Sequence, residues 1–226
     1  MSLFVYARST CGQCRAVAER DLAASVNADR RPDFRAQIIE GTFQAVSCAK
    51  CGASMRLPAH LSYLDVGRGQ WILTEGISLL PEWRAAEGEA RAIFDQTYGE
   101  SAPAMAREIG GALTPRLVFG WPALREKLIC GELGLDDVTL ELLKIAMLRT
   151  IPGAPYADAR ELRLIGGDAD ILRLCWIEAA SEEQLASVGM DRGIYDDIVE
   201  DPGGWSALRM DLTGHLFVDL KRLIFA

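Results

Sequence analysis

The protein has 226 residues, of which half are apolar and a quarter are charged, with a formal net charge of −8. This is the composition of a globular protein with a full-sized core, and it excludes a disordered chain. It also excludes a membrane-spanning chain, because every apolar run falls well short of the roughly 20 residues that a membrane helix needs.

The charge is unevenly distributed along the chain. Residues 1–60 hold eight Lys/Arg and five Asp/Glu, whereas residues 61–226 hold sixteen and twenty-seven, so the two parts carry +3 and −11. The N-terminus shows neither a basic leader nor a long apolar segment, so we expect no secretory signal and a cytoplasmic protein.

The first sixty residues predict short strands interrupted by two cysteine pairs. Strands are expected at 16–26, from its loose alternation of apolar and polar residues, and at 42–46, directly before the second cysteine pair. Between the two, Pro32 opens a short helix over 33–40, and Gly41 suits the residue that ends it.

The middle of the chain predicts a hairpin and then helices. Strands at 54–57 and 61–66 precede a tight connection at 67–69 and a further strand at 70–73. The spacing of apolar residues then predicts helices over 81–98, 104–109, 122–130 and 138–148. Asp136 or Asp137 is the expected cap of the last helix.

Two prolines and a glycine in residues 151–155 predict a hinge, which divides the chain into parts 1–150 and 151–226. The second part predicts a small α+β region, and the sequence leaves open whether it packs on the same core. Its expected elements are a hairpin of 161–165 and 171–177, a short helix from the capping box at Ser181, and helices over 192–199 and 216–225.

Four of the six cysteines form two CxxC pairs, Cys11/Cys14 and Cys48/Cys51. Two residues between cysteines let both sulfurs point at one ion, and two such pairs supply the tetrahedral set of thiolates that Zn²⁺ prefers. The pairs are separated by residues 15–47, a longer gap than a compact zinc site has. We therefore expect an elaborated zinc-ribbon-like β region with an inserted strand and helix.

A redox function is the alternative for the first pair. The segment 4–14 is similar to the strand-then-CxxC opening of glutaredoxin-like proteins, in which a helix N-terminus lowers the pKa of the first cysteine. Such a domain needs a buried βαβ unit after the motif, and we find none before Cys48. Metal binding is therefore favoured over a redox function and over four structural thiols that pair by coincidence.

The chain resembles the CpXC domain proteins, a bacterial and archaeal group named for two Cys-Pro-X-Cys motifs, from Cys11 to about Leu148. The resemblance implies a zinc site and a shared fold, but no activity. Gly12 and Ala49 stand where the family has proline, and Arg15 stands where a glycine commonly follows the first pair. Beyond the cysteines, the similar segments are 25–32, 39–43, 48–52, 57–58, 63–65, 124–128, 134–137 and 141–144.

The remaining reactive residues favour ordinary structural roles. His60 and His215 have no partner at a ligand spacing, and four thiolates already fill the coordination shell of a structural zinc. Cys130 and Cys175 lie in apolar stretches, where a free cysteine behaves as a small hydrophobe.

We expect a zinc-binding, non-catalytic scaffold or adaptor that binds another protein. Nucleic-acid binding by the basic first sixty residues is the alternative, but the acidic remainder disfavours it. A thiol oxidoreductase is the third hypothesis. Because four cysteines leave no coordination position for water, the sequence favours a structural zinc over a catalytic one.

Overall fold

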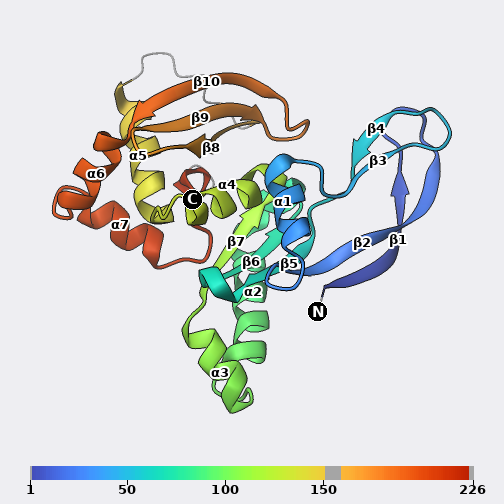
Figure 1. Cartoon of the computed structure of the whole chain (residues 1–226), viewed down its shortest axis with the longest axis horizontal. Coiled ribbons are helices and arrows are strands. Elements are labelled where there is room, and N and C mark those ends of the chain that lie inside the picture. The colour runs from blue at the N-terminus through green and yellow to red at the C-terminus, as the bar shows by residue number, and fades with distance from the viewer. Residues whose placement is uncertain (1, 151–158, 224–226) are drawn as a thin grey trace.

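The computed structural model describes residues 2–150 and 159–223, and it confirms the α+β class (Figure 1). The described strands are β1 (Leu3–Thr10), β2 (Val17–Asn27), β3 (Ala45–Ser47), β4 (Ser54–Arg56), β5 (Leu61–Asp65), β6 (Gln70–Glu75), β7 (Thr114–Phe119), β8 (Arg160–Gly167), β9 (Ile171–Glu178) and β10 (Gln184–Asp191). The described α-helices are α1 (Pro32–Glu40), α2 (Trp83–Tyr98), α3 (Ala104–Gly111), α4 (Gly120–Glu132), α5 (Asp137–Thr150), α6 (Arg192–Glu200) and α7 (Ser206–Thr213).

The largest sheet has the strand order β1-β2-β5-β6-β7. β1 pairs antiparallel with β2, and β5 pairs antiparallel with β6, whereas the β2/β5 and β6/β7 pairs are parallel. Only the last residues of β2, Ser25 to Asn27, pair with β5. The rest of β2 therefore extends with β1 beyond the sheet as a long hairpin, which lies beside the β3–β4 hairpin (Figure 1).

Helix α4 lies between the sheet and the C-terminal strands (Figure 1). Its Leu124 and Leu128 pack with Tyr63 of β5 and Ile72 of β6 in one apolar cluster. A second cluster joins Ile129 of α4 to α5, β8, β9, α6 and α7. The C-terminal strands thus share apolar contacts with α4 and α5, while the division at residue 150 stays a prediction.

Most elements predicted from the pattern are present. The segment from Pro32 forms α1, and Gly41 ends it with a left-handed φ of 79°. The 61–66 and 70–73 segments form the β5–β6 hairpin, and the 161–165 and 171–177 segments form the β8–β9 hairpin. Asp136 caps α5, because its Oδ1 accepts a hydrogen bond from the Thr139 N–H at 2.7 Å.

The short helix predicted from Ser181 is wrong, because the chain turns there into strand β10. Glu182 has a φ of 61°, which turns the chain back towards β9. Its N–H donates to the Glu178 carbonyl at 2.8 Å, and the Glu178 N–H donates to the Glu183 carbonyl at 2.9 Å. Pairing with β9 therefore outweighs the local capping signal.

The helix predicted over 216–225 is also wrong where the structure describes it. Leu216 to Asp219 are not helical, and only a 3₁₀ turn at Leu220–Leu223 follows. The backbone of Leu216 is satisfied from outside, since its N–H donates to Glu87 and its carbonyl accepts from the Leu117 N–H. These long-range partners hold the segment in a non-helical course, and residues 224–226 of the prediction lie outside the described residues.

Three further differences concern boundaries and missed elements. The strand predicted over 42–46 begins only at Ala45 and forms β3, because Gln44 before it has a left-handed φ of 58°. Strand β7 and helix α7 were not predicted. The hinge predicted at 151–155 lies outside the described residues.

Among residues 2–150 and 159–223, no helix combines the length and apolar character that crossing a membrane requires.

Candidate metal centre

The first cysteine pair lies in the turn between β1 and β2. The Cys11 N–H donates to the Ala16 carbonyl at 2.8 Å, and the Arg15 N–H donates back to the Cys11 carbonyl at 3.0 Å. Arg15 adopts a left-handed φ of 59°. The two hydrogen bonds close a tight loop whose side chains at Cys11 and Cys14 face the second hairpin.

The second pair lies in an equivalent turn between β3 and β4. The Cys48 N–H donates to the Ala53 carbonyl at 2.9 Å, and the Gly52 N–H donates to the Cys48 carbonyl at 2.8 Å. Gly52 has a left-handed φ of 73°. The two turns therefore share one hydrogen-bond pattern, and they differ in that an arginine takes the left-handed position of the first turn and a glycine that of the second.

The two turns bring the four sulfur atoms together. Cys11 Sγ lies 3.8 Å from Cys51 Sγ, and Cys14 Sγ lies 3.6 Å from Cys48 Sγ. All four sulfurs lie within 4.8 Å of one another. Zinc–sulfur bonds of about 2.3 Å place the corners of a tetrahedron about 3.8 Å apart, so the spacing suits one four-coordinate ion.

Backbone hydrogen bonds favour the ionised form at two of these sulfurs: the N–H groups of Cys14 and Gln13 lower the pKa of the Cys11 thiol, and a second pair acts on Cys48. The N–H groups of Cys51 and Lys50 lower the pKa of the Cys48 thiol to about 6. At Cys14 the Ala16 N–H lowers the pKa, but desolvation and the neighbouring thiols outweigh it and raise the pKa to about 12. Four thiolates at this spacing repel one another, so a bound cation is what allows all of them to ionise.

A small cavity of about 120 Å³ adjoins the sulfurs of Cys11 and Cys48, and Arg20 and Lys50 line it. Arg20 donates from Nη2 to the Ser47 carbonyl at 3.1 Å. Its Nε is buried and has no hydrogen-bond partner among the described residues. An unpaired N–H beside cysteine sulfurs fits a site of negative charge, which is what four thiolates around a divalent ion produce.

Sequence reasoning did not identify Arg20. Alternation along β2 places it on the same side of the strand as Ala18, and this side meets β4 through Met55. Only the pairing of the two hairpins in space shows that it lies beside the cysteines.

The geometry does not match a redox CxxC motif. The closest sulfur contacts join one motif to the other, and the chain after Cys14 continues into strand β2. A helix N-terminus that would lower the pKa of the first cysteine is therefore missing from this position. The similarity to glutaredoxin-like proteins is limited to the strand that precedes Cys11.

A model of the CpXC protein family matches residues 9–144, more than half of the chain. The chain belongs to the CpXC family. This CpXC protein contains both cysteine pairs within the matched segment, as the resemblance implied. No protein with a curated description and no solved structure matches it.

The other predicted residues lie away from the four cysteines. Cys130 is buried on α4 and Cys175 is buried on β9. His60 Nδ1 lies 2.6 Å from a carboxylate oxygen of Glu75, and His215 Nδ1 lies 2.8 Å from one of Glu87. None of the four belongs to the cysteine cluster.

Proposed function

We propose that this CpXC protein binds one Zn²⁺ through Cys11, Cys14, Cys48 and Cys51, and that the ion has a structural role. The observation that carries the proposal is the convergence of four sulfurs from two hairpins at a tetrahedral spacing. Soft thiolates in this geometry select zinc or iron. Four protein ligands leave no position for water or substrate, so the ion has no catalytic task.

The hairpins have little else to hold them together. Every residue of β1 is exposed or half-buried, and so is β2 from Val17 to Leu22. The β3–β4 hairpin has three residues in each strand. An ion bound by both turns would supply the link that an apolar core supplies elsewhere in the molecule.

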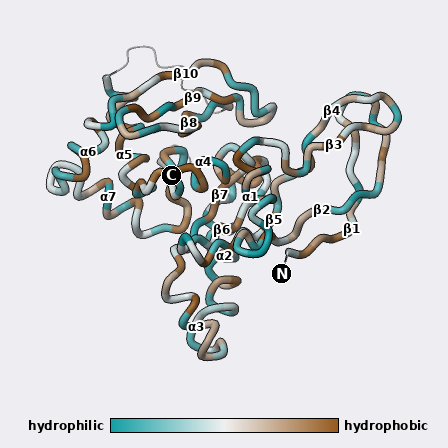
Figure 2. The backbone as a smooth tube through the Cα atoms, in the orientation of Figure 1, coloured by the Kyte–Doolittle hydropathy of each residue, from teal (hydrophilic) through white to brown (hydrophobic). Residues whose placement is uncertain are grey.

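We further propose that the metal-fixed hairpins present a surface to a partner protein, and that this occurs in the cytoplasm. Strand β1 exposes a run of apolar side chains, Leu3, Phe4 and Val5, and its Tyr6 is 74% exposed. Figure 2 colours much of the β1 backbone as hydrophobic. Exposed apolar clusters are typical of protein-binding surfaces. The neighbouring Arg8 lies 3.8 Å from Glu19, and this acidic partner favours a protein over a nucleic acid.

Metal analysis of the purified full-length protein tests the zinc proposal. We expect one zinc per chain in the wild type, and its loss in Cys48→Ser. The matched control is Cys175→Ala, which removes a buried thiol outside the cluster and is expected to keep the zinc. A wild-type protein that is folded without metal would rule the proposal out.

The scaffold role has a separate test. Proteins captured from cell extract by the wild type are compared with those captured by Tyr6→Ser, which alters the exposed surface without removing a cysteine. We expect one partner to be retained by the wild type and lost from the variant. Equal capture by both forms, or retardation of nucleic acid at low salt, would contradict the role.

A further inference from the structure

The four cysteine sulfurs contact one another across the two hairpins, and these contacts define two pairs. Cys11 Sγ in the first turn lies 3.8 Å from Cys51 Sγ in the second, and Cys14 Sγ lies 3.6 Å from Cys48 Sγ. Each pair therefore joins one hairpin to the other, and each takes one cysteine from either CxxC motif.

Each pair combines a buried sulfur with a more open one. Cys11 is 3% exposed and Cys48 is 6% exposed, whereas Cys51 is exposed and Cys14 is half-buried. Cysteines that bind a metal are thiolates, which is the form that peroxides oxidise, and exposure decides which thiolate reacts first. A small oxidant from solution would therefore meet Cys51 first.

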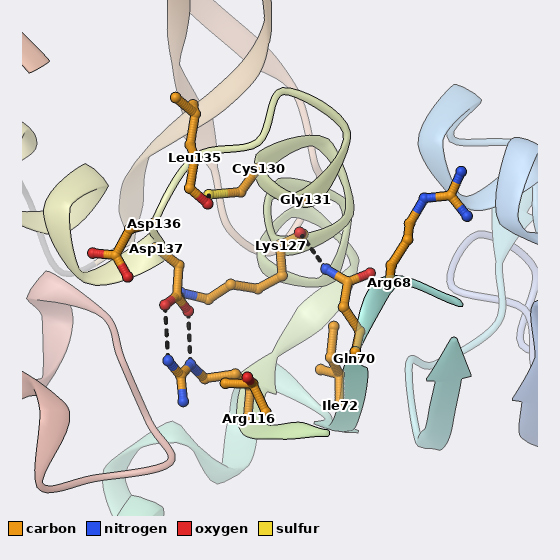
Figure 3. Close-up of a pocket in the computed structure, with 12 residues that line it drawn as sticks. Arg68, Gln70, Ile72, Arg116, Lys127, Cys130, Gly131, Leu135, Asp136 and Asp137 are labelled. Atoms are coloured by element: carbon orange, nitrogen blue, oxygen red, sulfur yellow. Dashed lines mark hydrogen bonds and ion pairs between the residues drawn. The ribbon is translucent and has the colours of Figure 1, made fainter. Parts of the chain in front are cut away.

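The other two cysteines have no sulfur neighbour in this cluster and are shielded from solvent. Cys130 on α4 is buried, and its sulfur donates to the Leu135 carbonyl at 3.3 Å (Figure 3). Cys175 on β9 is buried as well, and its sulfur donates to the Trp176 carbonyl at 3.3 Å. Both thiols therefore serve as internal controls for reactivity.

We propose that the metal centre is a redox-sensitive link, in which a hydroperoxide exchanges the zinc for disulfides between the two hairpins. The disulfide between Cys11 and Cys51 forms first, and the one between Cys14 and Cys48 follows. This inference rests on the proposed zinc role. Its consequence is that the hairpins stay joined, by covalent bonds, after the ion has left.

The exchange takes two steps. The Cys51 thiolate attacks the hydroperoxide oxygen that carries the hydrogen, the O–O bond breaks, and the leaving oxyanion takes a proton from water, so Cys51 becomes a sulfenic acid. The Cys11 thiolate then attacks the Cys51 sulfur, the S–O bond breaks, hydroxide leaves and the disulfide forms. Two thiolates lose two electrons, and the peroxide gains them. The uncharged disulfide sulfurs no longer bind Zn²⁺, whose own charge is unchanged.

The alternative pairing would have the opposite effect on the fold. Disulfides within the motifs, from Cys11 to Cys14 and from Cys48 to Cys51, would also expel the ion. They would leave the β1–β2 and β3–β4 hairpins without a link between their turns. The pairing therefore decides whether the hairpin surface survives oxidation.

Trypsin distinguishes the two pairings. Its cleavage sites place Cys11 and Cys14 together in peptide 9–15, Cys48 in peptide 36–50 and Cys51 in peptide 51–56. Disulfides between the hairpins join peptide 9–15 to each of the other two. Disulfides within the motifs close peptide 9–15 on itself and join the other two to each other.

The zinc-loaded full-length protein is treated with a small molar excess of hydrogen peroxide. Released zinc is followed with a coloured indicator, free thiols are alkylated, and the tryptic digest is analysed by mass spectrometry without reduction. We expect zinc to be lost while peptide 9–15 becomes linked first to 51–56 and then to 36–50. Cys130 and Cys175 should stay reduced.

Amide hydrogen exchange measures the retained link. The peroxide-treated protein is compared with reduced protein from which a chelator has removed the zinc, so that neither sample holds metal. A cross-link between the turns restricts their opening, so exchange there should be at least about tenfold slower in the oxidised sample.

Three results would overturn the proposal. The first is that disulfides form within the motifs. The second is that peroxide releases zinc without joining peptide 9–15 to another peptide. The third is that zinc and all four thiolates of the cluster are retained, or that Cys130 and Cys175 are oxidised first. Absence of zinc from the untreated protein, which is measured before the peroxide is added, would instead refute the underlying zinc role.

Discussion

The cysteine hairpins and the α4–α5 region both bring several ionisable groups close together. They differ in how the charges of these groups are balanced. At the hairpins four sulfurs converge, no hydrogen bond or ion pair among the described residues joins them to a cationic side chain, and the residues of β1 are exposed or half-buried. In the α4–α5 region every buried charge has a partner of opposite sign. Lys144, for example, contacts both Glu126 and Glu141, and all three side chains are fully buried.

This difference shows where each region obtains its stability. The ion pairs of the α4–α5 region lie inside an apolar shell that includes Leu140 and Leu142, so this part can hold its charges without a ligand. The hairpins lack such a shell, and under the proposed zinc role a cation from solution takes its place. On that proposal one region depends on metal supply, and the other does not.

Removing one partner from the buried cluster is expected to have the largest effect on the fold. Lys144→Met leaves the carboxylates of Glu126 and Glu141 without their ammonium group, and the free energy of unfolding should fall by about 3–5 kcal/mol. Urea denaturation measures this. The control is Arg173→Met, which breaks an exposed pair with Asp168 and should cost less than about 0.5 kcal/mol. Similar losses of unfolding free energy in both variants would show that the buried ion pairs stabilise the fold no more than an exposed pair does.

Acid should destabilise the two regions at different pH values. Burial opposes the ionisation of Asp219, but the charges of Arg163 and Lys144, together with hydrogen bonds from Lys221 and Arg163, outweigh it and lower the pKa to about 2, from a usual value of 3.8. A depressed carboxyl pKa stabilises the fold above pH 3.8, and this contribution of about 2 kcal/mol disappears as the pH falls towards 2.

Protons compete with the metal at four thiolates, so the ion should leave the hairpins at a higher pH than this. Zinc release and far-UV circular dichroism, followed on the same acid titration, compare the two events. Simultaneous loss of metal and of helical signal would contradict the independence of the two regions.

The smallest expected effect concerns the two turns at the metal centre. Arg15 and Gly52 both have left-handed φ angles, which cost roughly 1 kcal/mol or more for a residue with a side chain. Arg15→Gly should therefore tighten zinc binding about fivefold, and Gly52→Ala should weaken it by a similar factor. A Cβ at Gly52 meets no atom within 4 Å, so the effect is that of the backbone alone.

A zinc-competition titration with a coloured chelator measures both variants. Gly12→Ala is the matched control, because Gly12 has open space around it and no left-handed φ, and its zinc affinity should not change. Changes of the same sign at positions 15 and 52 would contradict the equivalence of the two turns.

The cysteine cluster could be predicted from the sequence because the spacing within each CxxC pair already lets two sulfurs point at one ion. Hairpins such as β5–β6 were predicted for the same reason, since alternation and a tight glycine turn are both local signals. Helix α1 is likewise marked at both ends, by Pro32 and Gly41.

The elements that were missed depend on partners far away in the chain. Strand β7 begins with Thr114 and Pro115 and pairs in parallel with β6, and its buried C-terminal half shows no alternation. Strand β10 pairs with β9, and the non-helical segment at Leu216 is held by Glu87. The hydrogen bond from Gln70 to the Lys127 carbonyl is of the same kind, because it forms only once the sheet and α4 have packed together.

Amide hydrogen exchange of the full-length protein, with and without a metal chelator, tests the dependence of the hairpins on metal most directly. With metal removed, we expect faster exchange in β1, β3, β4 and the first half of β2, and unchanged exchange in α4 and α5. Unchanged exchange in the hairpins after the metal has been removed would contradict a structural role for the four cysteines.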